Sequence, residues 1–313
     1  MTAYIVRRLL AVVPVMVTVA VFVFFLVRLA PGDPAAIIAG EDATEEAIEA
    51  VRAKLGLDRP MLEQFVIWVG RLLQGDLGMS IFSNLPVSHL IAQRLEPTVA
   101  LTLSTLLVAI CLAVPIGVVA AWKARKLADR VVMIFAVLGF ALPGFLVAYV
   151  LIYLFAVKLN WLPVQGYRPL SEGFWPFVEG LILPSVTLGT TYMALIARIT
   201  RASMLEVLSQ DYIRTANSKG LATKRVLLLH ALKNAGVPIV TVIGIGIALL
   251  ISGVVITETV FNIPGLGRLT VDAVLKRDYP IVQGLILVFA AAKVIVNLLI
   301  DISYVFLDPR IRY

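Results

Sequence analysis

Few side chains in this 313-residue sequence have the types and spacing that chemistry requires. Lys293, Asn297 and Asp301 recur every four residues, which places them on one face of a helix inside an apolar stretch. At 1.5 Å per residue, about 12 Å of helix axis separates Lys293 from Asp301, so these two side chains cannot pair directly. An ionisable group in such a stretch is costly unless it is paired or hydrated. We expect this stripe either to make polar contacts between helices or to contact a substrate in a wet cavity.

The usual groups of catalysis are missing from the sequence. His89 and His230 are far apart and Cys111 is the only cysteine, so no histidine metal site, intrachain disulfide or thiol–metal cluster is expected. Ser88 precedes His89, but no acidic partner that could orient the histidine is identifiable. No G-x-x-x-x-G-K-[ST] phosphate loop occurs either. We expect no catalytic residue, no metal, no resident cofactor and no enzymatic activity.

The composition indicates a chain whose solvent is largely lipid. Hydrophobic residues make up 60% of the sequence, charged residues 15%, and the mean hydropathy is +0.96. A soluble domain is about half apolar and about a quarter charged. Six apolar stretches approach or exceed the roughly 20 residues that cross a bilayer. They cover residues 9–29, 99–121, 131–157, 181–197, 239–257 and 284–306.

The first stretch, after Arg7 and Arg8, is too long for a signal peptide and lacks a small-x-small cleavage site, so we expect an uncleaved anchor. Pro115, Pro143 and Pro184 are expected to kink or start spans.

The basic residues set the expected orientation. With the N-terminus inside, fifteen lysines and arginines lie in the inner segments and five in the two short outer loops. This is the bias of a membrane protein with both termini inside. The net charge of +7 is therefore explained by topology, and no nucleic-acid partner is expected.

A segment at about residues 30–98 is long enough to form an extracytoplasmic insert. "ATEEAIEAVRAKLG" is typical of a helix capped by Thr44 and ended by Gly56. "RPMLEQFVIWVGRLLQG" predicts a second helix, with Pro60 at its first position and Gly75 at its end. The insert is expected either to pack on the membrane helices as a lid or to dock an outer partner. The apolar face of the second helix needs a packing partner, and it comprises Leu62, Phe65, Val66, Val69 and Leu73.

A polar passage at 211–238 interrupts the apolar pattern and predicts two short inner helices at an angle. Asp211 and Lys219 have the charge order that a helix dipole favours, Gly220 supplies a left-handed stop, and Thr223 can cap the second helix. The segment is either a solvated loop or a docking element for a soluble partner. Four apolar residues are expected to rest on the chain's own helices, namely Val226, Leu227, Leu229 and Leu232.

At these residues the chain resembles the permease subunits of bacterial ABC importers for dipeptides, oligopeptides and nickel. Their EAA-type loop has an Ala-x-x-x-Gly core, which stands here as Ala216 and Gly220. The general pattern has Glu-Ala where this chain has Arg214 and Thr215, and Pro238 comes late, as in the peptide-importer branch. The resemblance covers essentially the whole chain. Its further strings are "RLAPGDP", "LGLDRP", "GDLGMS", "ETVFNIPGLGRL", "RDYP" and "LDPRIRY".

The resemblance implies a single transmembrane domain in the bacterial cytoplasmic membrane, with a five-helix core at 99–306 and a coupling loop at 202–238. The subunit would pair with a second, related permease, above two cytoplasmic ATPases that bind ATP and Mg²⁺. An extracytoplasmic receptor would deliver the substrate, which could be a peptide, glutathione, a nickel chelate or a sugar. The residues implied in ATPase coupling are Tyr212, Arg214, Thr215, Ala216, Lys219 and Gly220.

Small residues recur every four positions in the fifth span, at Gly244, Ala248 and Ser252. Such a stripe lets membrane helices approach closely, so we expect helix packing there, or a wall of the translocation path.

Glu258 ends the fifth span and precedes a turn-rich loop that contains Pro264, Gly265 and Gly267. This loop is either an outer gate or receptor contact, or an ordinary tight re-entrant loop.

A self-sufficient secondary transporter or channel is the alternative function. It would show paired intramembrane charges or inverted repeats with broken helices. The sequence has a single mid-span lysine and no convincing repeat.

Overall fold

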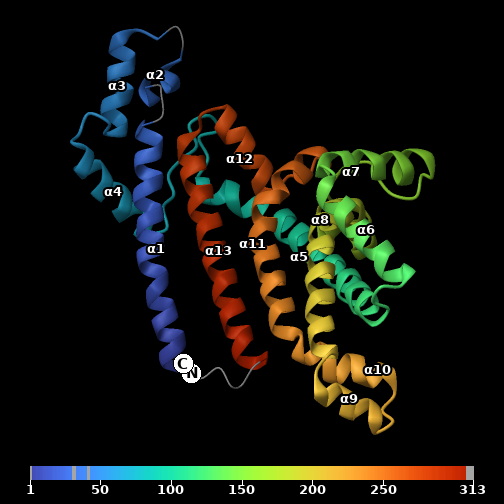
Figure 1. The fold of residues 1–313 in the computed structure, drawn as a ribbon. Coiled ribbons are helices and arrows are strands. Elements are labelled where there is room, and N and C mark those ends of the chain that lie inside the picture. Colours follow the sequence, from blue (N-terminus) through green and yellow to red (C-terminus); the bar gives the residue numbers. More distant parts are fainter. Residues whose placement is uncertain (1, 30–32, 41–42, 308–313) are drawn as a thin grey trace. The chain divides into compact units, whose positions relative to one another are not determined.

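The computed structural model describes residues 2–29, 33–40 and 43–307, and helices build the chain throughout these ranges (Figure 1). In the described part, extended pairing is limited to an isolated antiparallel bridge between Met79 and Pro86. The predicted all-α class is therefore confirmed.

The chain divides into two compact units. We call residues 1–8, 96–268 and 293–313 the core unit, and residues 9–95 and 269–292 the second unit. Four described helices belong partly to each unit, namely α1 (Thr2–Leu29), α5 (Val87–Trp122), α12 (Leu266–Leu275) and α13 (Tyr279–Leu307). The core unit also holds α6 (Leu127–Ala141), α7 (Gly144–Leu151), π-helix η1 (Ile152–Lys158), 3-10 helix η2 (Leu170–Glu172), α8 (Phe174–Leu208), α9 (Asp211–Ser218), α10 (Thr223–Arg225), π-helix η3 (Val226–Leu232) and α11 (Gly236–Val260).

Helix α8 is the centre of the core unit, because α6, α7 and α11 all pack against it. Figure 1 shows α8 and α11 side by side in yellow and orange, with α9 and α10 at their shared end. Small residues allow the close approaches. A Cβ on Gly117 would lie 2.7 Å from the Ala197 carbonyl oxygen, and one on Gly139 would lie 3.3 Å from Thr190. The helices can therefore meet backbone to backbone at these positions.

The predicted span at 131–157 is not one helix. It is broken at Leu142 and Pro143, and the axes on either side differ by 108°. Proline restricts the residue before it to extended backbone and lacks an N–H, which explains why α6 ends here. Pro115 and Pro184 lie inside the continuous helices α5 and α8.

Three described helical segments are long and apolar enough to cross a membrane, namely Val87–Trp122, Phe174–Leu208 and Tyr279–Asp301. Two bent pairs raise the number to five if each pair is one span, and α1 (Thr2–Leu29) carries a shorter apolar stretch at Leu10–Phe25. Five of the six predicted stretches therefore lie within single helices, and the stretch at 131–157 is divided among α6, α7 and η1.

The second unit holds most of α1 with α2 (Pro34–Ala39), α3 (Glu45–Leu55) and α4 (Met61–Leu73). The Thr44 hydroxyl accepts the Ala47 amide at 3.4 Å, and Gly56 ends α3 in the left-handed conformation, as predicted. Pro60 is the residue before α4 rather than its first position, and Gln74 ends that helix. Arg52 of α3 donates to Asp33, which caps α2, at 2.5 Å.

The apolar face of α4 is only partly covered within the described chain. Phe65 packs on the fully buried Phe24 of α1, with ring centroids 5.1 Å apart. Leu62, Val66 and Leu73 are 75%, 62% and 83% exposed, so the packing partner expected for this face is missing over most of its length.

Two of the recognised strings meet inside the second unit. Ser80 of "GDLGMS" donates to the carboxylate of Asp278 of "RDYP" at 2.6 Å, and both residues are 2% exposed. The Ile81 amide donates to the same carboxylate at 3.3 Å. This buried contact fixes the loop after α4 against the start of α13.

Candidate functional site

Helix α9 presents the predicted coupling residues on an exposed face. Tyr212, Arg214, Thr215, Lys219 and Gly220 are all exposed. Arg214 donates to Asp211 one turn earlier at 3.3 Å, with both side chains largely in solvent. The face therefore offers a basic, hydrogen-bonding surface that is free to meet another molecule.

Ala216 differs from the rest of the predicted coupling set. It is 7% exposed and packs with Ile213, Met204 and Val226 in an apolar cluster beneath α9. Its side chain therefore cannot belong to the exposed contact surface. Ala216 holds α9 against α8 and η3, and that burial explains the need for a small apolar residue.

The second helix of the loop differs from the expectation in three ways. Its cap residue is Ala222, Thr223 is already helical and makes no capping bond, and most of the helix is π-helical. Val226 is buried and Leu227 and Leu232 are half-buried, as expected. Leu229 is 60% exposed and does not join the apolar cluster, so the expectation that it rests on the chain's own helices is wrong.

Gly220 forms the predicted left-handed stop between the two helices. Its φ is +75°, and a Cβ built there would meet no atom within 4 Å. A side chain would therefore fit in the space at this position. Glycine is favoured here because of the left-handed φ with which the chain turns between the two helices.

A buried ion pair anchors the loop end of α8. Arg201 donates to both oxygens of Asp129, at 2.5 and 2.8 Å, and the Arg125 amide donates to the same carboxylate at 2.8 Å. Asp129 is 4% exposed. The pair joins the start of α6 to α8. The sequence analysis counted Arg201 only as a basic residue of the inner face and did not single out Asp129.

Glu258 is fully buried at the end of α11, where its carboxylate organises the following loop. It accepts the Thr98 hydroxyl at 2.5 Å and the Arg268 amide at 2.9 Å, while the Thr98 hydroxyl accepts the Leu266 amide at 2.8 Å. A Cβ on Gly265 would clash with the carboxylate. The buried Glu258 carboxylate therefore holds the loop in its conformation.

Gly267 is the second glycine of this loop with no room for a side chain, because a Cβ there would lie 2.8 Å from the backbone of Val255. Pro264 is exposed. Of the four residues predicted for an outer gate or receptor contact, Pro264 alone presents its surface, and the other three build the loop.

Gly244 lies where α11 and α13 approach each other in the core unit. A Cβ there would overlap the Ile300 side chain as it now lies, so the absence of a side chain at Gly244 allows this close packing. The side chains of Ala248 and Ser252 lie outside the described residues.

The stripe on α13 lies mostly at the surface of the chain. Lys293 and Asn297 are exposed, while Asp301 is half-buried and interacts with other groups. Lys293 and Asn297 are therefore not buried between the described helices.

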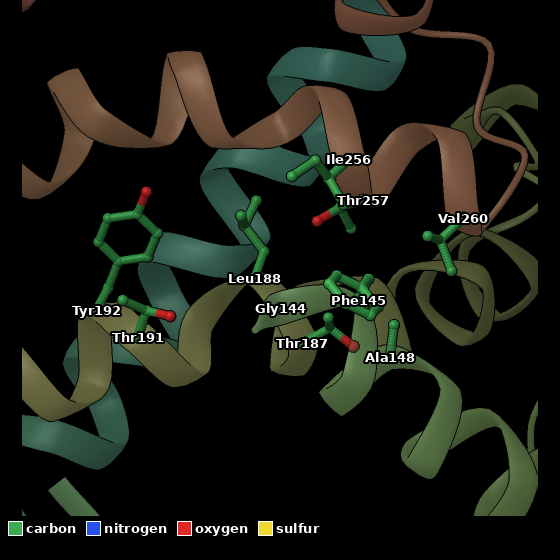
Figure 2. Close-up of a pocket in the computed structure, with 10 residues that line it drawn as sticks. All are labelled: Gly144, Phe145, Ala148, Thr187, Leu188, Thr191, Tyr192, Ile256, Thr257 and Val260. Carbon is green, nitrogen blue, oxygen red and sulfur yellow. The ribbon is translucent and has the colours of Figure 1, made fainter. Parts of the chain in front are cut away.

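A cavity of about 160 Å³ opens between α7, α8 and α11 (Figure 2). Its polar groups are the hydroxyls of Thr187, Thr191, Tyr192 and Thr257, and none of its ten lining residues is charged. Thr187 is 3% exposed, and its buried hydroxyl has no hydrogen-bond partner among the described residues. Sequence analysis did not single out these threonines, because scattered hydroxyls on three helices form no motif.

Comparisons with known proteins cover nearly the whole chain. The model of the family described as "Binding-protein-dependent transport system inner membrane component" matches residues 113–313, and the model of its N-terminal part matches residues 1–102. A probable peptide ABC transporter permease of Sinorhizobium fredii is 51% identical over the full length of both chains. The glutathione transport system permease protein GsiC of Escherichia coli is 43% identical in strain CFT073 and 42% in K12, again over both full lengths.

Proposed function

The chain belongs to the family of binding-protein-dependent transport system inner membrane components, and we propose that it imports peptides. It is a multi-pass permease of an ABC importer in the inner membrane. The substrate class rests on the full-length relative described as a probable peptide permease. Glutathione, for which other relatives are named, is also a small peptide with free carboxylates. Both names favour short peptides over metal chelates and sugars.

In this proposal the energy for transport reaches the chain mechanically. The sequence contains no phosphate loop, so ATP and Mg²⁺ bind to two partner ATPases. Shifting a two-state equilibrium from 1:99 to 99:1 requires about 5.5 kcal/mol of differential binding. The exposed face of α9, with Tyr212, Arg214 and Lys219, receives this energy.

The proposed topology has six crossings, with both termini and α9 on the cytoplasmic side. It is supported by the excess of lysine and arginine in the segments assigned to the inside. In this topology α6 and α7 together make one broken crossing. A second permease completes the passage and a receptor delivers the peptide from outside.

A defined peptide set tests the substrate class. The chain is purified with its partner subunits, reconstituted with the receptor and supplied with ATP, and the uptake of di- and tripeptides, glutathione and a nickel chelate is measured. We expect uptake of di- and tripeptides. Whether glutathione is also taken up depends on whether the receptor binds it. Uptake of the nickel chelate alone would contradict the proposal.

A further inference from the structure

The cavity between α7, α8 and α11 is lined by the beginning of a helix. Gly144 and Phe145 are the first two residues of α7, and both line the cavity. The first amides of a helix have no acceptor within it. Here Leu146 and Val147 already donate to the Pro143 carbonyl, at 3.0 and 3.3 Å, and no side chain caps the helix. The break at Pro143 therefore leaves the amides of Gly144 and Phe145 as hydrogen-bond donors at the cavity.

A second donor comes independently from α8. The Thr187 hydroxyl is buried beside the cavity without a partner among the described residues. By contrast, Thr190 on the same helix donates to the Val186 carbonyl at 2.7 Å, which is how a helical threonine is commonly satisfied. Figure 2 shows Thr187 next to the start of α7, with Thr257 of α11 across the cavity. An unpaired buried hydroxyl costs free energy, so this site favours a ligand that accepts a hydrogen bond.

The charges decide which ligand fits. The N-terminal end of a helix is electrically positive, and the ten lining residues include no acid that would hold a cation. Membrane transporters with broken helices direct such helix ends at carboxylates of their substrates. We propose that this cavity binds a carboxylate of the peptide in transit, through the amides of Gly144 and Phe145 and the hydroxyl of Thr187.

The size of the cavity agrees with an end group rather than a whole substrate. Its volume of about 160 Å³ is below the roughly 300–1,000 Å³ of a site that encloses a small molecule. The carboxylate is thus held at α7 while the remainder of the peptide lies outside the cavity. This inference rests on the proposed function, because only a peptide importer would bring a peptide carboxylate here.

Two substitutions each remove one of the proposed donors. Gly144→Pro deletes one amide N–H at a helix position that proline favours, and a Cβ at 144 meets no atom within 4 Å. Pro143 already has the extended backbone that a following proline requires, with φ −60° and ψ 134°. Thr187→Val deletes the hydroxyl at nearly constant shape. Gly144→Ala adds a Cβ but keeps the amide, so it measures the effect of bulk alone. The matched control is Thr190→Val, which removes a hydroxyl that is already satisfied.

The experiment compares Ala-Ala-Ala with its C-terminal amide in proteoliposomes that contain the assembled transporter, ATP and receptor. Receptor binding of each peptide is measured separately, and uptake is compared at equal receptor occupancy. We expect wild type and the Thr190→Val control to prefer the free acid about tenfold, as for the loss of one hydrogen bond to a charged group. Gly144→Pro and Thr187→Val should reduce this preference at unchanged amounts of protein in the membrane.

The outcomes separate the two proposals. If wild type takes up peptide with ATP but shows no preference for the free acid, or if both donor variants keep the preference, the carboxylate site is wrong. If wild type takes up neither peptide although the receptor binds them, the proposed function itself is wrong.

Discussion

Glu258 shows how a single buried residue dictates its neighbours. A fully buried carboxylate must have its oxygens hydrogen-bonded, and Thr98 and the Arg268 amide supply those bonds. The loop must then curl tightly around the acid, which leaves no room for a Cβ at Gly265. The sequence predicted a turn-rich loop here, but the partner at Thr98 is 160 residues away and no local pattern identifies it.

Gly265→Ala should destabilise the protein by about 1–3 kcal/mol, because the added methyl overlaps the Glu258 carboxylate. The measurement is thermal unfolding of the purified transporter in detergent. Gly70→Ala is the control, since a Cβ on Gly70 meets no atom within 4 Å. Equal unfolding temperatures for the two variants would show that the carboxylate does not occupy this position.

Asp129→Asn should lower the stability by about 3 kcal/mol, because it leaves the Arg201 guanidinium without its charged partner in a mostly buried site. Asp211→Asn disrupts an ion pair of the same type whose side chains are 76% and 94% exposed, and it should leave the unfolding temperature unchanged. A smaller shift for Asp129→Asn than for Asp211→Asn would contradict the buried pair.

At the scale of helices, predictions from local signals succeeded where a single residue decides the outcome. Thr44, Gly56 and Gly220 each cap or stop a helix as expected. Boundaries that depend on packing were predicted less well. The stretch at 131–157 was predicted as one span because its hydropathy is continuous, and Thr223 was predicted as a cap because its type is right.

Gly220→Ile tests the bend between α9 and α10. A β-branched residue in the left-handed conformation costs about 1–2 kcal/mol, so the chain should leave this conformation and reorient α9. We expect normal amounts in the membrane and at least about tenfold less ATP-dependent uptake, since coupling requires about 5.5 kcal/mol to be transmitted. Gly220→Asn tolerates the same φ and should retain uptake. Full uptake by the isoleucine variant would exclude the bend from coupling.

The contact between α2 and α3 should depend on pH. The hydrogen bond from Arg52 lowers the pKa of Asp33 below its ordinary value of 3.8. A carboxyl whose pKa is lowered in the folded state contributes stability that is present above the ordinary pKa and lost as the pH falls through the lowered one. The protection of amides in α2 and α3 against hydrogen exchange, taken relative to the intrinsic rate at each pH, should therefore fall below about pH 3.8 in wild type. Asp33→Asn should exchange faster at neutral pH and lose this dependence; an unchanged pH profile in the variant would contradict the assignment.

For the whole molecule, composition and charge placement were sufficient to predict an all-helical membrane protein, and the ordered strings were sufficient to identify the family. The sites that depend on distant partners could not be predicted. The Asp129–Arg201 pair spans 72 residues, and the cavity combines hydroxyls of two helices with the start of a third. Pro143 was expected to kink or start a span, but its type does not reveal which distant side chains face that break. Ala216 illustrates the same limit, because its place in a motif does not reveal which side of α9 it occupies.

The source of energy tests the central claim most directly. The chain is reconstituted with its copurified subunits and receptor, and peptide uptake is measured with ATP inside the vesicles, with a non-hydrolysable analogue, and with a proton or sodium gradient alone. Membership of the ABC importer family predicts uptake only with hydrolysable ATP and receptor. Gradient-driven uptake by the isolated chain, without any ATPase subunit, would contradict this account.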